Sequence, residues 1–141
     1  MSHKCKNLLI RCMDFRLNDE VEKWTKESDI FEGGFDIVSI AGASKILAGE
    51  NSAAIENFLG NVDVSVNLHH AEKIVIFHHS DCGAYAKEYK FDSVEEEKKK
   101  QIEDMEKSKM IILEKFPTVE IVLVWGVLED EEGKKVKFEI V

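Results

Sequence analysis

The 141-residue sequence contains little proline and little cysteine, and it lacks any long apolar segment. No stretch approaches the roughly 20 apolar residues that span a bilayer, which argues against a transmembrane helix. The apolar run at residues 8–10 follows a charged start and is too short for a signal peptide. We therefore expect a cytoplasmic protein that is not bound to a membrane.

Basic residues are outnumbered by acidic ones, with 19 Lys and Arg against 28 Asp and Glu. The net charge is −9 and the pI is near 5.1. Such a balance argues against nucleic acid or an anionic lipid surface as a partner, since both require a basic face. The three cysteines are an odd number, and the cytosol keeps thiols reduced. Metal ligation or catalysis is therefore a better explanation for paired cysteines than a disulfide.

Apolar, β-branched runs alternate with stretches of helical character along the chain. Strands are predicted at 7–13, 35–40, 74–79, 119–128 and 135–141, and helices at 52–59, 62–68 and 93–116. A further helix is predicted after Asn18, which can cap it, in a unit that Gly33 and Gly34 end. This alternation indicates a single α/β domain over residues 1–141. We expect a mostly parallel central sheet of about five strands with helices on both faces. The last strand follows an acidic turn and is expected to lie antiparallel at the edge.

The boundaries of three predicted helices follow from local sequence signals. Residues 62–68 alternate as a strand would, but the next strand begins too soon for a parallel crossover, so a helix is predicted there. The preceding helix is expected to break at Gly60. Ser93 and Glu96 have the spacing of a capping box and open the long helix, which Pro117 ends. The charge run at 95–100 predicts a solvated face of that helix.

Candidate metal ligands follow two of the predicted strands. Cys12 ends the first strand, while His79 and Cys82 follow the third. Ligands bind beyond the carboxyl ends of parallel strands, where the strand order reverses, so neighbouring strands would bring these side chains together. Two thiolates and one imidazole suit Zn²⁺ with an open fourth position, and such zinc lowers the pKa of a bound water to about 7. The resulting hydroxide is the expected nucleophile.

Asp14 and Arg16 lie on the loop that follows Cys12. Asp14 can accept a hydrogen bond from the hydroxide or bind the metal as a fourth ligand. Arg16 can hold the carboxylate in a bidentate pair and keep it ionised. In isolation this pair would be read as a surface ion pair, and Cys12 as a small core residue. We interpret their combination with the second strand end as a catalytic site.

The other candidate ligands are interpreted without a metal. His78 is expected to point away from His79 and to pack or meet solvent, and His69 and His70 are expected to face solvent at a helix end. Cys5 is interpreted as a free thiol. The small residues of the loop at 41–44 allow a ligand to approach the backbone closely.

These two motifs resemble those of the β-class carbonic anhydrases. Residues 12–16, Cys-Met-Asp-Phe-Arg, resemble the family's Cys-x-Asp-x-Arg, and residues 79–83, His-Ser-Asp-Cys-Gly, resemble its His-x-x-Cys-Gly. Residues 35–42 are similar to its second strand and following loop. The resemblance implies a zinc enzyme, a carbonate dehydratase that hydrates carbon dioxide to bicarbonate, built as a homodimer or a higher homo-oligomer. The expected substrate pocket comprises Phe15, Ala41, Gly42, Ala43, Gly83 and Tyr85, although Tyr85 can equally be a packing residue.

Two departures from the family pattern leave alternatives open. The loop at 40–43 reads Ile-Ala-Gly-Ala and lacks both of the family's asparagines, and the bulky Phe15 stands where small residues are common. The same site can therefore act on a carbon dioxide analogue, such as carbonyl sulfide or carbon disulfide. A different class is a non-catalytic zinc- or anion-binding protein, which permanent ligation by Asp14 would produce.

Overall fold

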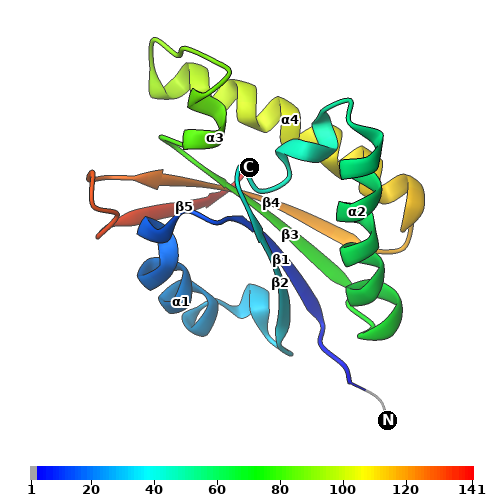
Figure 1. Ribbon diagram of the computed structural model, residues 1–141. Coiled ribbons are helices and arrows are strands. Elements are labelled where there is room, and N and C mark those ends of the chain that lie inside the picture. The colour runs from blue at the N-terminus through cyan, green and yellow to red at the C-terminus, as the bar shows by residue number, and fades with distance from the viewer. Residues whose placement is uncertain (1–2) are drawn as a thin grey trace.

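The computed structural model describes residues 3–141, whose strands form a five-stranded sheet in the order β2-β1-β3-β4-β5 (Figure 1). Strands β1 to β4 are mutually parallel, and β5 pairs antiparallel with β4 at the edge. The predicted mostly parallel α/β architecture is thus confirmed. The strand bounds are β1 (Asn7–Cys12), β2 (Phe35–Ile40), β3 (Lys73–His79), β4 (Glu120–Leu128) and β5 (Val136–Ile140).

The chain reverses its direction of travel across the sheet after β2. From β1 it crosses through α1 (Asn18–Glu27) to β2 on one side, and then returns through α2 (Ser52–Asp63) to β3 on the other side of β1. Short helix α3 (Gly83–Ala86) and long helix α4 (Val94–Lys115) lead to β4. Figure 1 shows α1 on one face of the sheet and α2, α3 and α4 on the opposite face. The reversal places the switch point between β1 and β3, where this topology binds ligands.

The two central strands carry the core. All six residues of β1 and six of the seven in β3 are buried, as expected for parallel strands covered on both faces. On the α1 face, the Trp24 ring stacks on Phe138 with centroids 4.3 Å apart and lies 5.4 Å from Phe77. On the other face, α4 contributes the buried Met105 and Ile112. Packing on both faces therefore fixes β3, whose end carries the candidate ligands.

The predicted break at Gly60 is wrong, whereas the predicted helix over 62–68 is confirmed. Helix α2 runs through Gly60 to Asp63 and continues as a π-helical turn, η4 (Val64–Leu68). A glycine inside a helix costs only about 1 kcal/mol. The buried side chains of Phe58 and Val62 flank this position and hold the helix against the core.

Helix α4 begins and ends as predicted, but its charge run is not wholly solvated. The Ser93 side chain caps the helix by accepting from the Glu96 N–H, and the helix ends at Lys115, two residues before Pro117. Within the charge run, Glu97 is buried, with an exposed fraction of 7%. The expectation of a solvated face is therefore wrong at Glu97, because this carboxylate finds hydrogen-bond donors in the protein.

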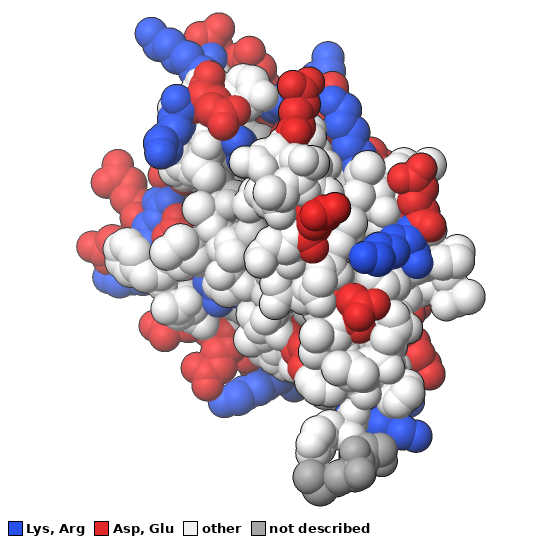
Figure 2. Space-filling view, turned by 45° about the vertical axis from the view of Figure 1, so that its right-hand side comes forward, with Lys and Arg blue, Asp and Glu red and all other residues white. Residues whose placement is uncertain are grey.

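The molecular surface carries charges of both signs. On the face shown in Figure 2, Lys and Arg are interspersed with Asp and Glu around the outline, and the mostly white centre also carries acidic side chains. The absence of a nucleic-acid partner stays a prediction. Among the helices of residues 3–141, none combines the length and the apolar character needed to cross a membrane.

Two glycine substitutions test this packing. A Cβ at Gly126 would lie 2.5 Å from Cε1 of Phe77, whereas a Cβ at Gly60 would meet nothing within 4 Å. Gly126→Ala should therefore lower the free energy of unfolding by about 1–3 kcal/mol, and Gly60→Ala should raise it by about 0.5–1 kcal/mol. Urea unfolding followed by tryptophan fluorescence measures both. Equal stability of the two variants would contradict the described contact between β4 and β3.

Candidate metal centre

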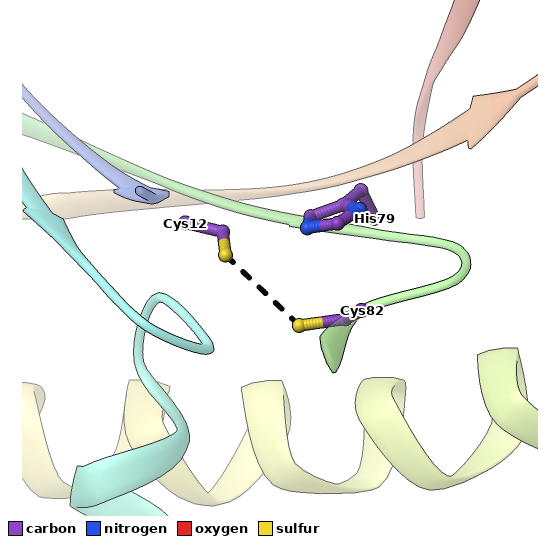
Figure 3. Close-up of side chains that lie close together, drawn as sticks. All are labelled: Cys12, His79 and Cys82. Carbon is purple, nitrogen blue, oxygen red and sulfur yellow. Dashed lines mark hydrogen bonds between the residues drawn. The ribbon is translucent and has the colours of Figure 1, made fainter. Parts of the chain in front are cut away.

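The three predicted metal ligands meet at the carboxyl ends of β1 and β3. These strands are hydrogen-bonded neighbours, so Cys12 at the end of β1 faces the loop that leaves β3 after His79. A turn with Asp81 at a φ of 55° then brings back Cys82, which caps α3. Figure 3 shows the three side chains converging, with the two Sγ atoms 4.0 Å apart. Their ligand atoms all lie within 4.8 Å of one another.

The donor geometry fits a tetrahedral zinc ion. Two sulfurs each about 2.3 Å from zinc are separated by about 3.8 Å, close to the observed 4.0 Å. His79 Nδ1 donates to the Ser80 carbonyl at 2.7 Å, which leaves Nε2 as the ring nitrogen that can bind a metal. This Nε2 is buried and has no hydrogen-bond partner among residues 3–141. A buried acceptor without a partner is costly, and a metal ion at this point would satisfy it.

The site also favours the thiolate that a metal requires. A hydrogen bond from the Cys82 thiol lowers the pKa of Cys12, and contacts with His79 and the Gly42 N–H, which lies 3.4 Å from Sγ, act in the same direction. The neighbouring Cys12 sulfur in turn raises the pKa of Cys82. Cys12 is thus held in the form that binds metal.

Arg16 joins the two ligand-bearing loops. Its guanidinium forms a bidentate pair with Asp14. Arg16 Nε lies 3.1 Å from Oδ1, and Arg16 Nη2 lies 2.7 Å from Oδ2. It also donates to the Asp81 carboxylate and carbonyl, each at 2.9 Å. Burial would raise the pKa of Asp14, but the hydrogen bonds from Arg16 outweigh it and lower that pKa. The predicted pair is therefore present, and it keeps Asp14 ionised beside the ligands.

A cavity of about 590 Å³ opens in front of this pair. Its lining includes three of the predicted pocket residues, Phe15, Ala41 and Gly83, together with Cys12, Met13, Asp14, Arg16, Asp81 and Ala84. Gly42, Ala43 and Tyr85 are not among the lining residues. Ala43 and Tyr85 are fully buried, and the Tyr85 hydroxyl donates to Asp104 at 2.8 Å. The part of each residue in substrate binding stays a prediction.

Helix α4 supplies two residues that sequence reasoning missed. The Glu97 carboxylate accepts the backbone N–H groups of Asp81 at 2.8 Å and Cys82 at 3.1 Å. Gln101 donates from Nε2 to the His79 carbonyl at 2.9 Å and to Glu97 at 3.1 Å. These contacts hold the ligand loop (residues 80–82), together with His79, which precedes the loop, and Cys82, which ends it. Outer contacts of this kind orient metal ligands and tune metal affinity.

His78 continues the same network into the core. Its Nδ1 donates to Gln101 Oε1 at 2.9 Å, and its Nε2 accepts from the Ser44 backbone N–H at 3.3 Å. Burial lowers the pKa of His78 to about 4, which keeps the ring neutral. His78 is not part of the Cys12–His79–Cys82 group, and of the two expected outcomes it packs in the core rather than meeting solvent. One sequence signal could have exposed the network: polar residues recur at helical spacing along α4, at Glu97, Gln101, Asp104 and Ser108.

Comparison with known proteins assigns the chain to a family. A family model described as "Putative carbonic anhydrase" matches residues 2–137. The chain belongs to this carbonic anhydrase family. Among its relatives is an uncharacterized protein of Rickettsia bellii (strain RML369-C), 35% identical in an alignment over 126 residues that covers 84% of this chain and 74% of the relative. Another, RC0076 of Rickettsia conorii, is 32% identical over 84% of this chain and 66% of the relative.

Solved structures of carbonic anhydrases share the fold. The β-carbonic anhydrase isoform I of Trichomonas vaginalis superimposes with a TM-score of 0.63 at 15% identity, covering 99% of this chain and 85% of that one. A carbonic anhydrase from Glaciozyma antarctica gives a TM-score of 0.54 at 18% identity, covering 98% of this chain and 83% of that one. At these identities the likeness establishes the fold alone.

The contacts of Glu97 predict a role in metal affinity. In Glu97→Gln, an NH₂ group replaces one of the two carboxylate oxygens and would face a backbone N–H donor. The ligand loop therefore loses one of its two hydrogen bonds to this side chain. We expect zinc affinity to fall by about 10–100-fold. Competition with a chromophoric chelator measures it. Glu95→Gln is the matched control, because it removes the same charge from an exposed position on the same helix. Equal affinities in the two variants would contradict the role.

The buried His78 predicts a pH dependence of stability. Its pKa of about 4 in the folded protein lies below the unfolded value near 6.5, so the unfolded chain binds the proton first. Stability should therefore fall as the pH drops from about 6.5 to about 4, by up to about 3 kcal/mol from this residue. Urea unfolding of metal-free protein measures it, with His78→Gln as the comparison. The variant should show a shallower slope over this window, and parallel curves would contradict the prediction.

Proposed function

We propose that the protein is a zinc-dependent carbonic anhydrase that hydrates carbon dioxide to bicarbonate. The observation that carries this proposal is a convergent Cys12–His79–Cys82 group beside an aspartate that is held by an arginine. Membership of the carbonic anhydrase family supports the reaction type. Cys12, His79 and Cys82 would hold a zinc ion, which would supply a hydroxide nucleophile near neutral pH. The three free cysteines fit a reducing compartment such as the cytoplasm.

Asp14 and Arg16 would orient the attacking oxygen. Asp14 Oδ2 lies 3.9 Å from His79 Nε2, so the carboxylate borders the metal position without belonging to the ligand group. Both carboxylate oxygens are bonded by Arg16, which holds them in a fixed direction. An ionised carboxylate there can accept a hydrogen bond from the nucleophile and turn its lone pair toward carbon. This arrangement supports a catalytic site over the non-catalytic alternative, in which Asp14 itself would occupy the fourth position.

The cavity suits a small, uncharged substrate. Its walls include the apolar side chains of Met13, Phe15 and Ala41, and Cys12 also lines it. Carbon dioxide and water yield bicarbonate and one proton, and the cavity opens to solvent, where buffer can take up that proton. Carbonyl sulfide is also small and apolar, so turnover of the two substrates on one preparation decides between them.

We further propose that the protein is a homodimer or a higher homo-oligomer. Met13 and Phe15 are apolar, with exposed fractions of 62% and 80%, and both lie beside the candidate site. Strand β2 is an edge strand, and its Ile37 side chain is also exposed. Exposed apolar side chains next to an unpaired strand edge favour burial against a second chain.

Stopped-flow carbon dioxide hydration between pH 7 and 9, on protein of known zinc content, tests the proposed function. Turnover well above the buffer blank and rising with pH is expected. His79→Asn should lose zinc and reduce the rate by more than about 100-fold, beyond the effect of changing a residue that only contacts a ligand. The control is His70→Asn, because His70 is exposed and precedes β3, at the opposite end of that strand from His79.

Two results would overturn the assignment. Full zinc occupancy without turnover at any pH would indicate a non-catalytic zinc protein. A clear preference for carbonyl sulfide over carbon dioxide would indicate the analogue as substrate.

A further inference from the structure

A second group of metal-binding side chains lies at the opposite end of the sheet. The ligand atoms of Cys5, Asp36 and His69 all lie within 4.8 Å of one another, and all three residues are partly buried. Cys5 precedes β1, Asp36 is the second residue of β2, and His69 follows η4. The group is therefore at the amino ends of the strands, whereas Cys12 and His79 are at the carboxyl ends.

The side chains of Cys5, His69 and Ser65 converge on one carboxylate oxygen of Asp36. Asp36 Oδ2 lies 2.8 Å from His69 Nδ1 and 3.4 Å from Cys5 Sγ, and it also accepts from the Ser65 hydroxyl at 2.8 Å. This oxygen can simply be a hydrogen-bond acceptor that links Cys5, Ser65 and His69 to β2. It can instead be a metal ligand, in which case a cation replaces the protons shared between these atoms.

The backbone holds the group together independently of its side-chain contacts. Leu8 and Asp36 are paired in the parallel register of β1 and β2, which fixes the start of both strands. The Cys5 N–H donates to the His69 carbonyl at 3.0 Å, which fixes the segment before β1 to the end of η4. A metal site formed here would thus be largely pre-organised, which reduces the cost of ordering its ligands.

The types of donor favour zinc over a hard cation. A thiol, an imidazole and a carboxylate are all zinc ligands, whereas Ca²⁺ and Mg²⁺ take oxygen donors. Zinc ligands in a tetrahedral site are about 3.3–3.5 Å apart, so the nitrogen and oxygen at 2.8 Å need to separate by only about half an ångström. A second imidazole stands close by, since the ring of His3 meets that of His69 edge-on with centroids 6.4 Å apart.

We propose that Cys5, Asp36 and His69 form a second zinc site, separate from the catalytic one, that fastens the segment before β1 to the end of η4. The partial exposure of all three side chains leaves one side of the site open to solvent or to His3. The site is structural in this proposal, because it ties together segments that enter the sheet at its amino edge. It does not depend on the proposed carbonic anhydrase activity.

Metal counting on a variant without the catalytic ligands tests the second site directly. Cys12→Ser/Cys82→Ser should retain one zinc per chain after dialysis, where the wild type retains two. Adding Cys5→Ser and His69→Ala to this variant should remove the remaining ion. The matched control adds His70→Asn instead, because Asn also accepts the left-handed backbone of His70, whose φ is 64°. That control should keep the ion.

Cobalt supplies a spectroscopic readout on the same proteins. Co²⁺ bound to Cys12→Ser/Cys82→Ser should show a thiolate-to-cobalt charge-transfer band that Cys5→Ser abolishes. Zinc should also raise the melting temperature of Cys12→Ser/Cys82→Ser, because an ion that binds only the folded state stabilises that state. The melting temperature of the Cys5→Ser/His69→Ala derivative should not change.

The proposal is overturned if Cys12→Ser/Cys82→Ser binds no zinc while its circular dichroism remains that of the wild type. It is also overturned if the bound ion survives removal of Cys5 and His69. Neither result bears on carbon dioxide hydration, which is measured on the wild type. Failure of the second site is therefore distinguishable from failure of the proposed function.

Discussion

Parallel pairing of β1 with β3 is the constraint on which the candidate metal centre depends. It brings together two segments that are about 70 residues apart in the sequence, and it aligns their carboxyl ends. Both strands are buried on both faces, so a slip of one residue would exchange the side chains that pack on the two faces of the sheet. The 4.0 Å separation of the Cys12 and Cys82 sulfurs is a consequence of that register and of the turn at Asp81.

The ligand loop is held from two directions. From the cavity side, Arg16 bridges Asp14 and Asp81, so the two ligand-bearing loops cannot move independently. From the helix side, Glu97 accepts two backbone N–H groups of the same loop. Burying a carboxylate is costly unless its oxygens are satisfied, and here backbone and side-chain donors satisfy them. These hydrogen bonds offset the cost of burying Glu97. They also fix the position of Cys82, a candidate metal ligand.

The two ends of the sheet differ in how they assemble side chains. At the carboxyl end, loops leave the strands after a topological switch, so a cavity forms there, and Cys12 and Asp14 line it. At the amino end, Cys5, Asp36 and His69 are held by strand pairing and by one backbone hydrogen bond, close to where segments enter the sheet. A site that admits substrate therefore belongs to the first end, and a site that ties segments together belongs to the second.

The sequence by itself determined the strands, their mostly parallel arrangement and the chemistry of the Cys12, His79 and Cys82 side chains. Apolar runs and the motif spacing are local properties, and local patterns can be read along the chain. Tertiary structure decided the burial of Glu97, because a charged residue in a charge run looks solvated until the loop that it contacts is placed above it. The same holds for Cys5, Asp36 and His69, which lie in three distant segments and share no motif. The continuation of α2 through Gly60 likewise depended on core packing, which outweighs the weak local preference of a glycine.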